Sequence, residues 1–267
     1  MLGIMKFSRI NLLLIYVILV WIILAIIFGV YDLQISIAVV DENSVWGNFG
    51  ADYGEMPGYG LIVVALTTYL GGYIKDTKKQ KILGYIGIVV GVIYILIGVF
   101  DQELDIGNIT LGSTLILSLA IYMSITWNKD WKDYRKISGL ISILALLNPL
   151  LLVQLIKLFW GRVRFRNLLP GYVDFTPWFL PQGFTDNYSF PSGNTAMSMM
   201  FLPLLVLVKD RKIKDPVKMV IIVLVIGWGL FVALSRIAVG AHYASDTLFS
   251  SGFAAIITIL FYKKIYK

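Results

Sequence analysis

Residues 10–30 read INLLLIYVILVWIILAIIFGV and contain no charged side chain. A helix of about 20 apolar residues is long enough to cross the hydrocarbon core of a bilayer. The stretch is longer than the apolar core of a secretory signal peptide, so we expect an uncleaved membrane span. Seven further apolar stretches follow, at residues 58–74, 82–100, 109–127, 137–156, 196–208, 217–235 and 246–262. The pattern predicts an all-α, polytopic membrane bundle of about eight transmembrane helices.

The composition agrees with this class of protein. Hydrophobic residues make up 58% of the chain, the mean hydropathy is +0.80, and charged residues make up only 15%, against about 25% in a typical soluble domain. The 267 residues include no cysteine and a single histidine, His242. These counts exclude disulfides and thiolate ligands and argue against a histidine-rich metal centre. We therefore expect neither a metal nor another cofactor.

The basic residues are distributed unevenly along the chain. Of the 23 Lys and Arg residues, 18 lie before the first stretch, after the last, or in the loops that follow the second, fourth and sixth. By the positive-inside rule, these segments and both termini face the cytoplasm. The acidic connections 32–55 and 101–105 contain no Lys or Arg and are placed outside. Because topology explains the net charge of +7, we expect no nucleic-acid partner.

The remaining five basic residues fall on the outer side and break this pattern. They are Lys157, Arg162, Arg164, Arg166 and Arg236. Four of them lie in KLFWGRVRFR, residues 157–166, at the end of the fifth stretch. A basic cluster of this kind commonly contacts lipid headgroups. The alternative is that an anionic ligand requires these cations on the outer side.

The single histidine lies in SRIAVGAHYASD, residues 235–246. His242 and Asp246 are four residues apart, so on a helix they share one face, where the carboxylate can hold the imidazole in one tautomer. Arg236 is placed to bind an anion beside the free ring nitrogen. A buried histidine paired with a nearby carboxylate is the simpler interpretation of this string alone.

A third string, SFPSGNT, occupies residues 189–195, directly before the sixth stretch. Pro191, Ser192 and Gly193 at a helix start leave backbone N–H groups and a hydroxyl free to bind an anion. An ordinary N-cap is the alternative. In the predicted topology all three strings lie on the outer side of the membrane.

Taken together and in this order, the three strings resemble the motifs of the type-2 phosphatidic acid phosphatase family, Lys-x6-Arg-Pro, Pro-Ser-Gly-His and Ser-Arg-x5-His-x3-Asp. The matching residues are Lys157, Arg164, Pro191, Ser192, Gly193, Ser235, Arg236, His242 and Asp246. The sequence departs from the family pattern at Phe165, in place of the proline, and at Asn194, in place of the histidine. We divide the chain into an N-terminal region, 1–136, with four spans and no readable motif, and a catalytic region, 137–267, with four spans.

The resemblance implies a lipid phosphatase at the outer face of a bacterial cell membrane. By analogy with the family, His242 attacks phosphorus and forms a phosphohistidine, Asp246 orients it, and position 194 protonates the leaving oxygen. The resemblance also implies the phosphate-binding residues Lys157, Arg164, Ser192, Gly193 and Arg236. The family's substrates suggest undecaprenyl diphosphate, phosphatidylglycerol phosphate or phosphatidic acid. Arg162 and Arg166 match no motif position, and we expect them to contact headgroups or the loop.

Asn194 leaves two functions open, because an amide cannot donate a proton reversibly near neutral pH. One is a phosphatase, either impaired or restricted to diphosphates with good leaving groups. The alternative is a catalytically inactive protein that binds or moves lipids. The substitution is either natural or engineered, and the intact remaining motif positions favour an engineered change. Lipids of the surrounding membrane are expected partners, and a homodimer formed through the first four spans is one expected assembly.

Overall fold

A computed structural model of the protein describes residues 8–267, and these residues form helices and connecting loops without any strand. The predicted all-α class is confirmed. The longer elements are α1 (Arg9–Val39), α2 (Val45–Tyr53), α3 (Met56–Gly71), α4 (Ile82–Phe100), α5 (Ile106–Thr126), α6 (Arg135–Ala145), π-helical η3 (Leu146–Leu152), α7 (Val153–Trp160), α8 (Gly193–Ser198), η6 (Met199–Val208), α9 (Pro216–Ala238) and α10 (Ala244–Tyr266). Short 3₁₀ turns are η1 (Lys79–Lys81), η2 (Trp131–Tyr134), η4 (Phe165–Asn167) and η5 (Pro170–Tyr172).

All eight apolar stretches form helices, but their lengths differ. Six helical segments within the described residues are long and apolar enough to cross a membrane: Arg9–Val39, Lys79–Phe100, Ile106–Thr126, Trp131–Asn167, Pro216–Ala238 and Ala244–Tyr266. The other two are α3, with 16 residues, and the shorter apolar segment Gly193–Val208. At 1.5 Å per residue, α3 extends for about 24 Å, less than the ~30 Å hydrocarbon core.

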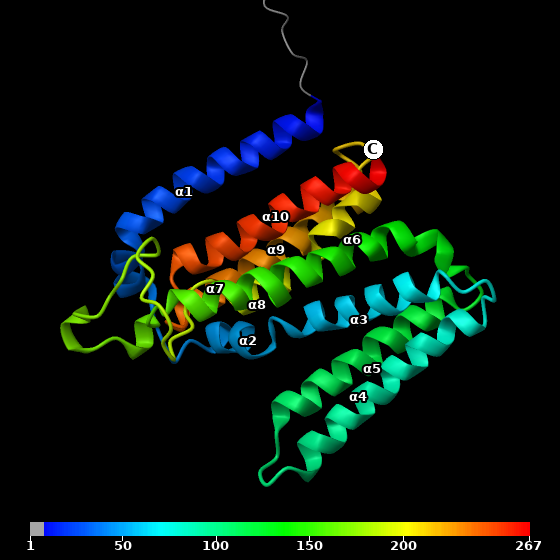
Figure 1. Cartoon of the computed structure of the whole chain (residues 1–267), viewed down its shortest axis with the longest axis horizontal. Helices are drawn as coiled ribbons and strands as arrows, with labels where there is room; N and C mark the ends of the chain where they lie inside the picture. Colours follow the sequence, from blue (N-terminus) through cyan, green and yellow to red (C-terminus); the bar gives the residue numbers. More distant parts are fainter. Residues whose placement is uncertain (1–7) are drawn as a thin grey trace, which may run out of the picture.

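The helices form an elongated bundle in which α10 lies between α1 and the helices α6 and α9 (Figure 1). A hydrophobic core joins Ala65 of α3, Leu144 of α6, Met200 of η6 and Ala254 of α10. The hairpin of α4 and α5 diverges from the rest of the bundle at one edge (Figure 1). At one end of the bundle, α2 and the loop that follows α7 lie beside the end of α1 (Figure 1).

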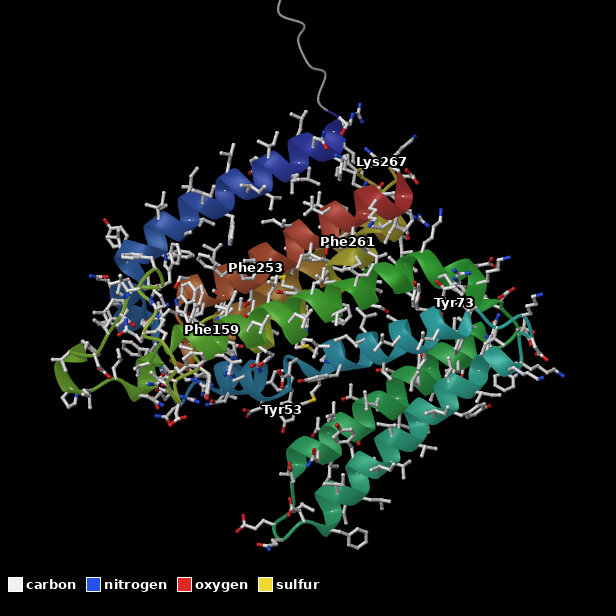
Figure 2. The ribbon with its side chains drawn as sticks, in the orientation of Figure 1. Tyr53, Tyr73, Phe159, Phe253, Phe261 and Lys267 are labelled. Atoms are coloured by element: carbon white, nitrogen blue, oxygen red, sulfur yellow. The ribbon has the colours of Figure 1, made fainter. Side chains whose placement is uncertain are left out.

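Apolar side chains cover the outside of the long helices, as a bilayer solvent requires. In α1, for example, Ile23 and Ile26 are 57% and 63% exposed. Figure 2 shows Tyr73 and Lys267 at one end of the bundle and Tyr53 and Phe159 towards the other. The protein is therefore a multi-pass membrane protein. Lys6, one of the basic residues used to assign the orientation, lies outside the described residues.

Pro149 interrupts the fifth span, as its missing N–H predicts. It lies in the π-helical segment η3, where the Val153 N–H donates to the Asn148 carbonyl five residues earlier. A π-helical segment contains more residues per turn than an α-helix. It therefore changes the angular position of α7, which carries Lys157, relative to α6.

Candidate active site

His242 lies in the turn between α9 and α10, at the end of the bundle that carries α2. Gly240 makes this turn possible with a left-handed φ of 63°, which costs glycine no steric strain. His242 Nδ1 lies 3.3 Å from Asp246 Oδ2, and the same oxygen accepts a 3.0 Å hydrogen bond from the Tyr243 N–H. The predicted pair is thus in contact. His242 precedes α10, so the two residues do not share a helix face. They meet because the Asp246 side chain bends back over the start of α10.

The Asp246 carboxylate is fully buried and held from several sides. Ser189 Oγ donates to Oδ2 at 2.5 Å, and Arg162 Nη1 donates to Oδ1 at 2.6 Å. Hydrogen bonds to the charged form favour that form, so Asp246 is held as an anion beside the imidazole.

The His242 ring is also buried, with 1% of its surface exposed. Burial lowers the pKa of His242 to about 4, and the cations Arg236 and Lys157 act in the same direction, while Asp246 opposes them. The imidazole is therefore neutral near pH 7. A neutral ring whose Nδ1–H faces a carboxylate has its other nitrogen available as a nucleophile.

Ser192 is the N-cap of α8. For the Ser192 hydroxyl, the ordinary N-cap interpretation of the third string is therefore correct. Ser192 Oγ accepts hydrogen bonds from the Thr195 N–H at 3.3 Å and the Thr195 hydroxyl at 2.9 Å. Residues 189–195 also lie against the other two motif strings. The Ser192 N–H donates to the Asp246 carbonyl at 3.1 Å, and a Cβ at Gly193 would lie 3.4 Å from Lys157 Nζ. The Lys157 ammonium therefore lies close to the backbone at Gly193.

Three cations from different elements face the same region: Lys157 of α7, Arg164 after it, and Arg236 of α9. They are close enough to repel one another electrostatically. Arg236 is 9% exposed, and its Nη1 donates to the Ala51 carbonyl at 3.2 Å. Within the described residues, the buried Arg236 Nε has no hydrogen-bond partner. An unpaired buried donor among repelling cations indicates a site for an anion.

Residues 138–267 match the family model of the PAP2 superfamily. This segment belongs to the PAP2 superfamily. This finding confirms the resemblance drawn from the three strings. No curated protein and no solved structure matches the chain.

In the PAP2 segment, Asn194 faces α2 across the site. Its Nδ2 donates to the Ala51 carbonyl at 3.1 Å, and the same carbonyl accepts from Arg236. Within the predicted acidic connection 32–55, residues Val45–Tyr53 form the short helix α2. Glu55 follows Ala51 by four residues. Burial raises the pKa of Glu55, while Arg236 and Lys157 oppose that shift.

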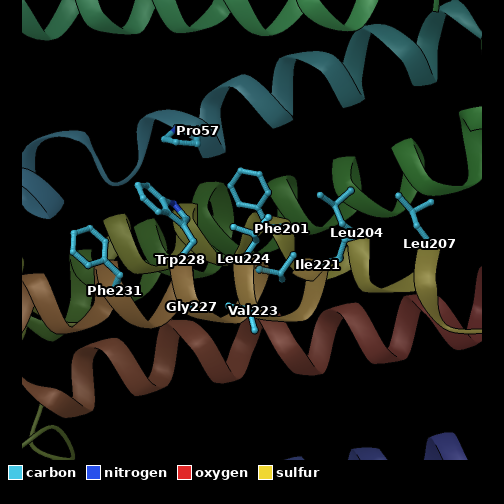
Figure 3. Close-up of a pocket in the computed structure, with 11 residues that line it drawn as sticks. Pro57, Phe201, Leu204, Leu207, Ile221, Val223, Leu224, Gly227, Trp228 and Phe231 are labelled. Carbon is cyan, nitrogen blue, oxygen red and sulfur yellow. The ribbon is translucent and has the colours of Figure 1, made fainter. Parts of the chain in front are cut away.

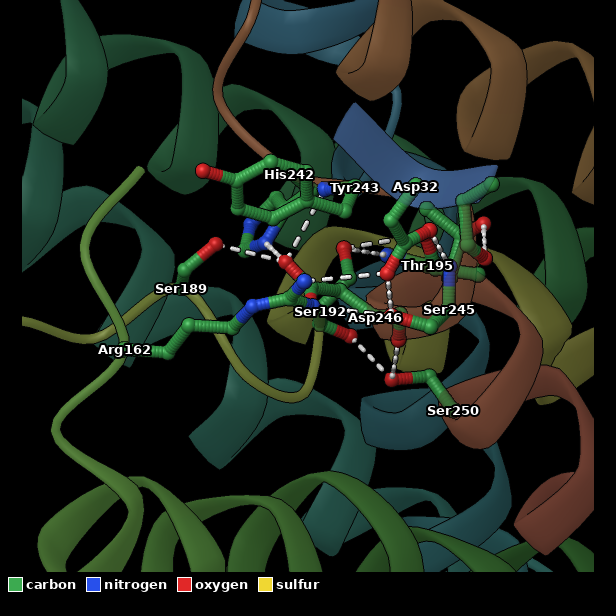
Figure 4. Close-up of polar contacts among 12 residues, drawn as sticks. Asp32, Arg162, Ser189, Ser192, Thr195, His242, Tyr243, Ser245, Asp246 and Ser250 are labelled. Carbon is green, nitrogen blue, oxygen red and sulfur yellow. Dashed lines mark hydrogen bonds and ion pairs between the residues drawn. The ribbon is translucent and has the colours of Figure 1, made fainter. Parts of the chain in front are cut away.

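Two expectations about charged residues need correction, because both residues are buried in the structure. Arg162 contacts the loop as expected, since its Nε donates to the Thr176 carbonyl at 2.9 Å. It is not at a headgroup position, however: it is 1% exposed and forms ion pairs with Asp32 and Asp246 (Figure 4). Asp32 was placed in an outer acidic connection, but α1 continues to Val39 and Asp32 is fully buried within it. An ionisable residue at the end of an apolar span is a signal of function. That signal was present in the sequence, but the expected span ended at residue 30, whereas α1 ends at Val39.

Arg166 was expected to contact headgroups or the loop, and for its side chain this stays a prediction. It is exposed, and its backbone N–H donates to the Gly240 carbonyl at 3.1 Å. The structure thus brings His242, Asp246, Ser192, Gly193, Lys157 and Arg236 to one end of the bundle, with Arg164 and Asn194 beside them. Their catalytic and phosphate-binding roles stay predictions.

Proposed function

We propose that the protein is a lipid phosphatase that removes a phosphate from a lipid phosphate or diphosphate through a phosphohistidine, at the outer face of a bacterial cell membrane. The observation that carries the proposal is the buried His242–Asp246 pair beside Arg236, whose Nε has no hydrogen-bond partner among residues 8–267. We assign catalysis to region 137–267. The candidate substrates remain undecaprenyl diphosphate, phosphatidylglycerol phosphate and phosphatidic acid.

The proposed reaction has two steps and uses side chains of this chain. In the first, the neutral His242 ring attacks phosphorus, a P–N bond forms, and the bond to the leaving oxygen breaks. Lys157, Arg164 and Arg236 stabilise the equatorial oxygens, while Asp246 stabilises the positive ring. In the second step, water attacks phosphorus, the P–N bond breaks, and inorganic phosphate leaves.

Asn194 restricts the first step, because its amide cannot protonate the leaving oxygen. A diphosphate expels a phosphate monoester, which needs less protonation than the alkoxide expelled from a monophosphate. We therefore expect the chain as it stands to prefer diphosphates. Asn194 also favours the alternative, a protein that binds lipids without turnover. Its amide is held by a hydrogen bond to the Ala51 carbonyl.

An apolar cavity beside the site supports a lipid substrate. It has a volume of about 610 Å³ and lies between α3, η6 and α9 (Figure 3). Its lining includes Pro57, Trp228 and Phe231. Pro57 follows Glu55 by two residues, and Phe231 precedes Ser235 by one helical turn, so the cavity begins near the phosphate-binding groups. A hydrocarbon chain suits such a lining.

Deciding between the two functions requires a measurement of phosphate release. The purified protein is incubated with each of the three candidate lipids, alongside the Asn194→His variant. Release from at least one lipid supports the phosphatase. Absence of release from every lipid by both proteins, with lipid binding retained, would leave the lipid-binding alternative.

The proposed orientation predicts opposite labelling of two loops. Asn43 precedes α2 and Thr77 follows α3, and both residues are exposed. Because the chain has no cysteine, Asn43→Cys and Thr77→Cys each create one thiol. In intact cells, an impermeant maleimide should label Asn43→Cys alone, and after permeabilisation it should label both. Labelling of Thr77→Cys from outside intact cells would contradict the orientation.

Arg236→Ala should weaken the binding of vanadate or inorganic phosphate in detergent by about 10- to 100-fold, the scale of a lost charge-assisted hydrogen bond. The reason is that the buried guanidinium has an unpaired Nε in the site. Isothermal titration provides the measurement. Arg166→Ala is the matched control, since it removes an equal charge from an exposed position nearby and should change affinity only slightly. Equal affinities for Arg236→Ala and the parent would show that the site is assigned wrongly.

A further inference from the structure

Asp32 is an acidic residue of α1 that no motif covers, and it lies outside the segment that matches the PAP2 superfamily. It is fully buried. Oδ1 accepts the Ser245 N–H at 3.0 Å, while Oδ2 accepts from Arg162 Nη2 at 2.9 Å and from the Ser245 hydroxyl. Ser245 directly precedes Asp246. The carboxylate of α1 is thus bound to the chain segment that holds the catalytic aspartate.

Arg162 connects the two carboxylates (Figure 4). Its Nη2 donates to Asp32, whereas its Nη1 donates to Asp246 at 2.6 Å and to Ser245 Oγ at 2.8 Å. Its Nε donates to the Thr176 carbonyl at 2.9 Å. The guanidinium carbon also lies 3.9 Å from the centre of the Tyr243 ring. The side chain is therefore fixed on all sides, and its position determines that of the Asp246 carboxylate.

The charges in this group explain why a second carboxylate matters. With Arg162 and Asp246 alone, one positive charge would cancel one negative charge. Asp32 adds a second negative charge, so the group retains a net negative charge beside His242. The cations Lys157 and Arg236 disfavour positive charge on the ring. Attack on phosphorus makes the imidazole positive, and this positive charge needs the retained negative charge for stabilisation.

We propose that Asp32 is a positioning residue for the His242 nucleophile, acting through Arg162 and Asp246. It holds the guanidinium so that Asp246 Oδ2 remains available to the Nδ1–H of the ring. The N-terminal region thereby completes the site of the catalytic region. The proposal rests on the proposed function, because it assigns His242 as the nucleophile.

The single histidine allows a test that does not depend on turnover. In protein labelled with ¹⁵N-histidine, the imidazole signals arise from His242 alone and report which nitrogen carries the proton. At pH 7, the parent should show the Nδ1–H tautomer. Asp32→Asn should show a mixture of tautomers. The neutral amide no longer balances the positive charge of Arg162, and the guanidinium is then free to pair more closely with Asp246.

Turnover provides the second readout, in the Asn194→His background. Asp32→Asn should lower kcat by about 10- to 100-fold, the scale of losing a residue that orients a site ligand, with KM nearly unchanged. Asp32→Glu should recover part of the loss. The matched control is Trp178→Phe, since the Trp178 indole also ties α1 to the site end of the bundle by donating to the Ala25 carbonyl at 2.8 Å. This control should leave the tautomer and kcat unchanged.

Two outcomes would overturn the proposal: an unchanged tautomer in folded Asp32→Asn, or an equal loss of kcat in Trp178→Phe. If Asp32→Asn does not fold, Ser245→Ala replaces it. That variant removes the hydroxyl between Asp32 and Arg162 and should shift the tautomer in the same direction, and no shift would again contradict the proposal. If no variant releases phosphate, the proposed function fails, while the tautomer still decides the role of Asp32.

Discussion

His242→Ala should abolish phosphate release in the Asn194→His background, with a loss of about 10⁴-fold or more. The chain contains no other histidine that could accept the phosphoryl group. The ring is buried with a low pKa, so it is present as the neutral nucleophile across the usual assay range. The measurement is release of inorganic phosphate from undecaprenyl diphosphate and phosphatidic acid.

Two further variants separate chemistry from stability in this experiment. Asp246→Asn should be less severe than His242→Ala, because the carboxylate orients and stabilises the ring without forming the P–N bond. Size-exclusion chromatography before the assay identifies the folded fraction of each variant. If folded His242→Ala still releases phosphate, His242 is not the nucleophile, and the phosphohistidine mechanism is wrong.

Restoring a histidine at position 194 should raise turnover by about 10²-fold, the scale of a general acid. Asn194 lies next to Arg236, since both side chains donate to the Ala51 carbonyl. An imidazole there can deliver a proton to the leaving oxygen. The gain should be larger for phosphatidic acid than for undecaprenyl diphosphate, because the first expels an alkoxide and the second a phosphate monoester.

Asn194→Gln is the matched control for this gain. It retains an amide and changes the length of the side chain without adding a group that titrates near neutral pH, so it should not raise turnover on either lipid. An equal gain for Asn194→Gln and Asn194→His would mean that position 194 acts through packing. Unchanged turnover of Asn194→His on every lipid would remove the basis for the phosphatase proposal.

The sequence by itself determined the helical membrane bundle and the three strings of the site. Apolar stretches of bilayer length must satisfy their backbone hydrogen bonds internally, and so they form helices wherever they occur. The contact between His242 and Asp246 is equally local, since only four residues separate them. Family membership followed from the order and spacing of the strings, which require no knowledge of packing.

Only the tertiary structure decided which distant groups complete the site. Asp32 and Arg162 are 130 residues apart, and the charge pattern gave both of them ordinary surface roles. The Ala51 carbonyl, which holds Arg236 and Asn194, carries no sequence signal because every residue has a carbonyl. A charge buried at low dielectric needs a partner. The docking of α1 and α2 at the site end of the bundle determines which partner that is, and no local pattern encodes this docking.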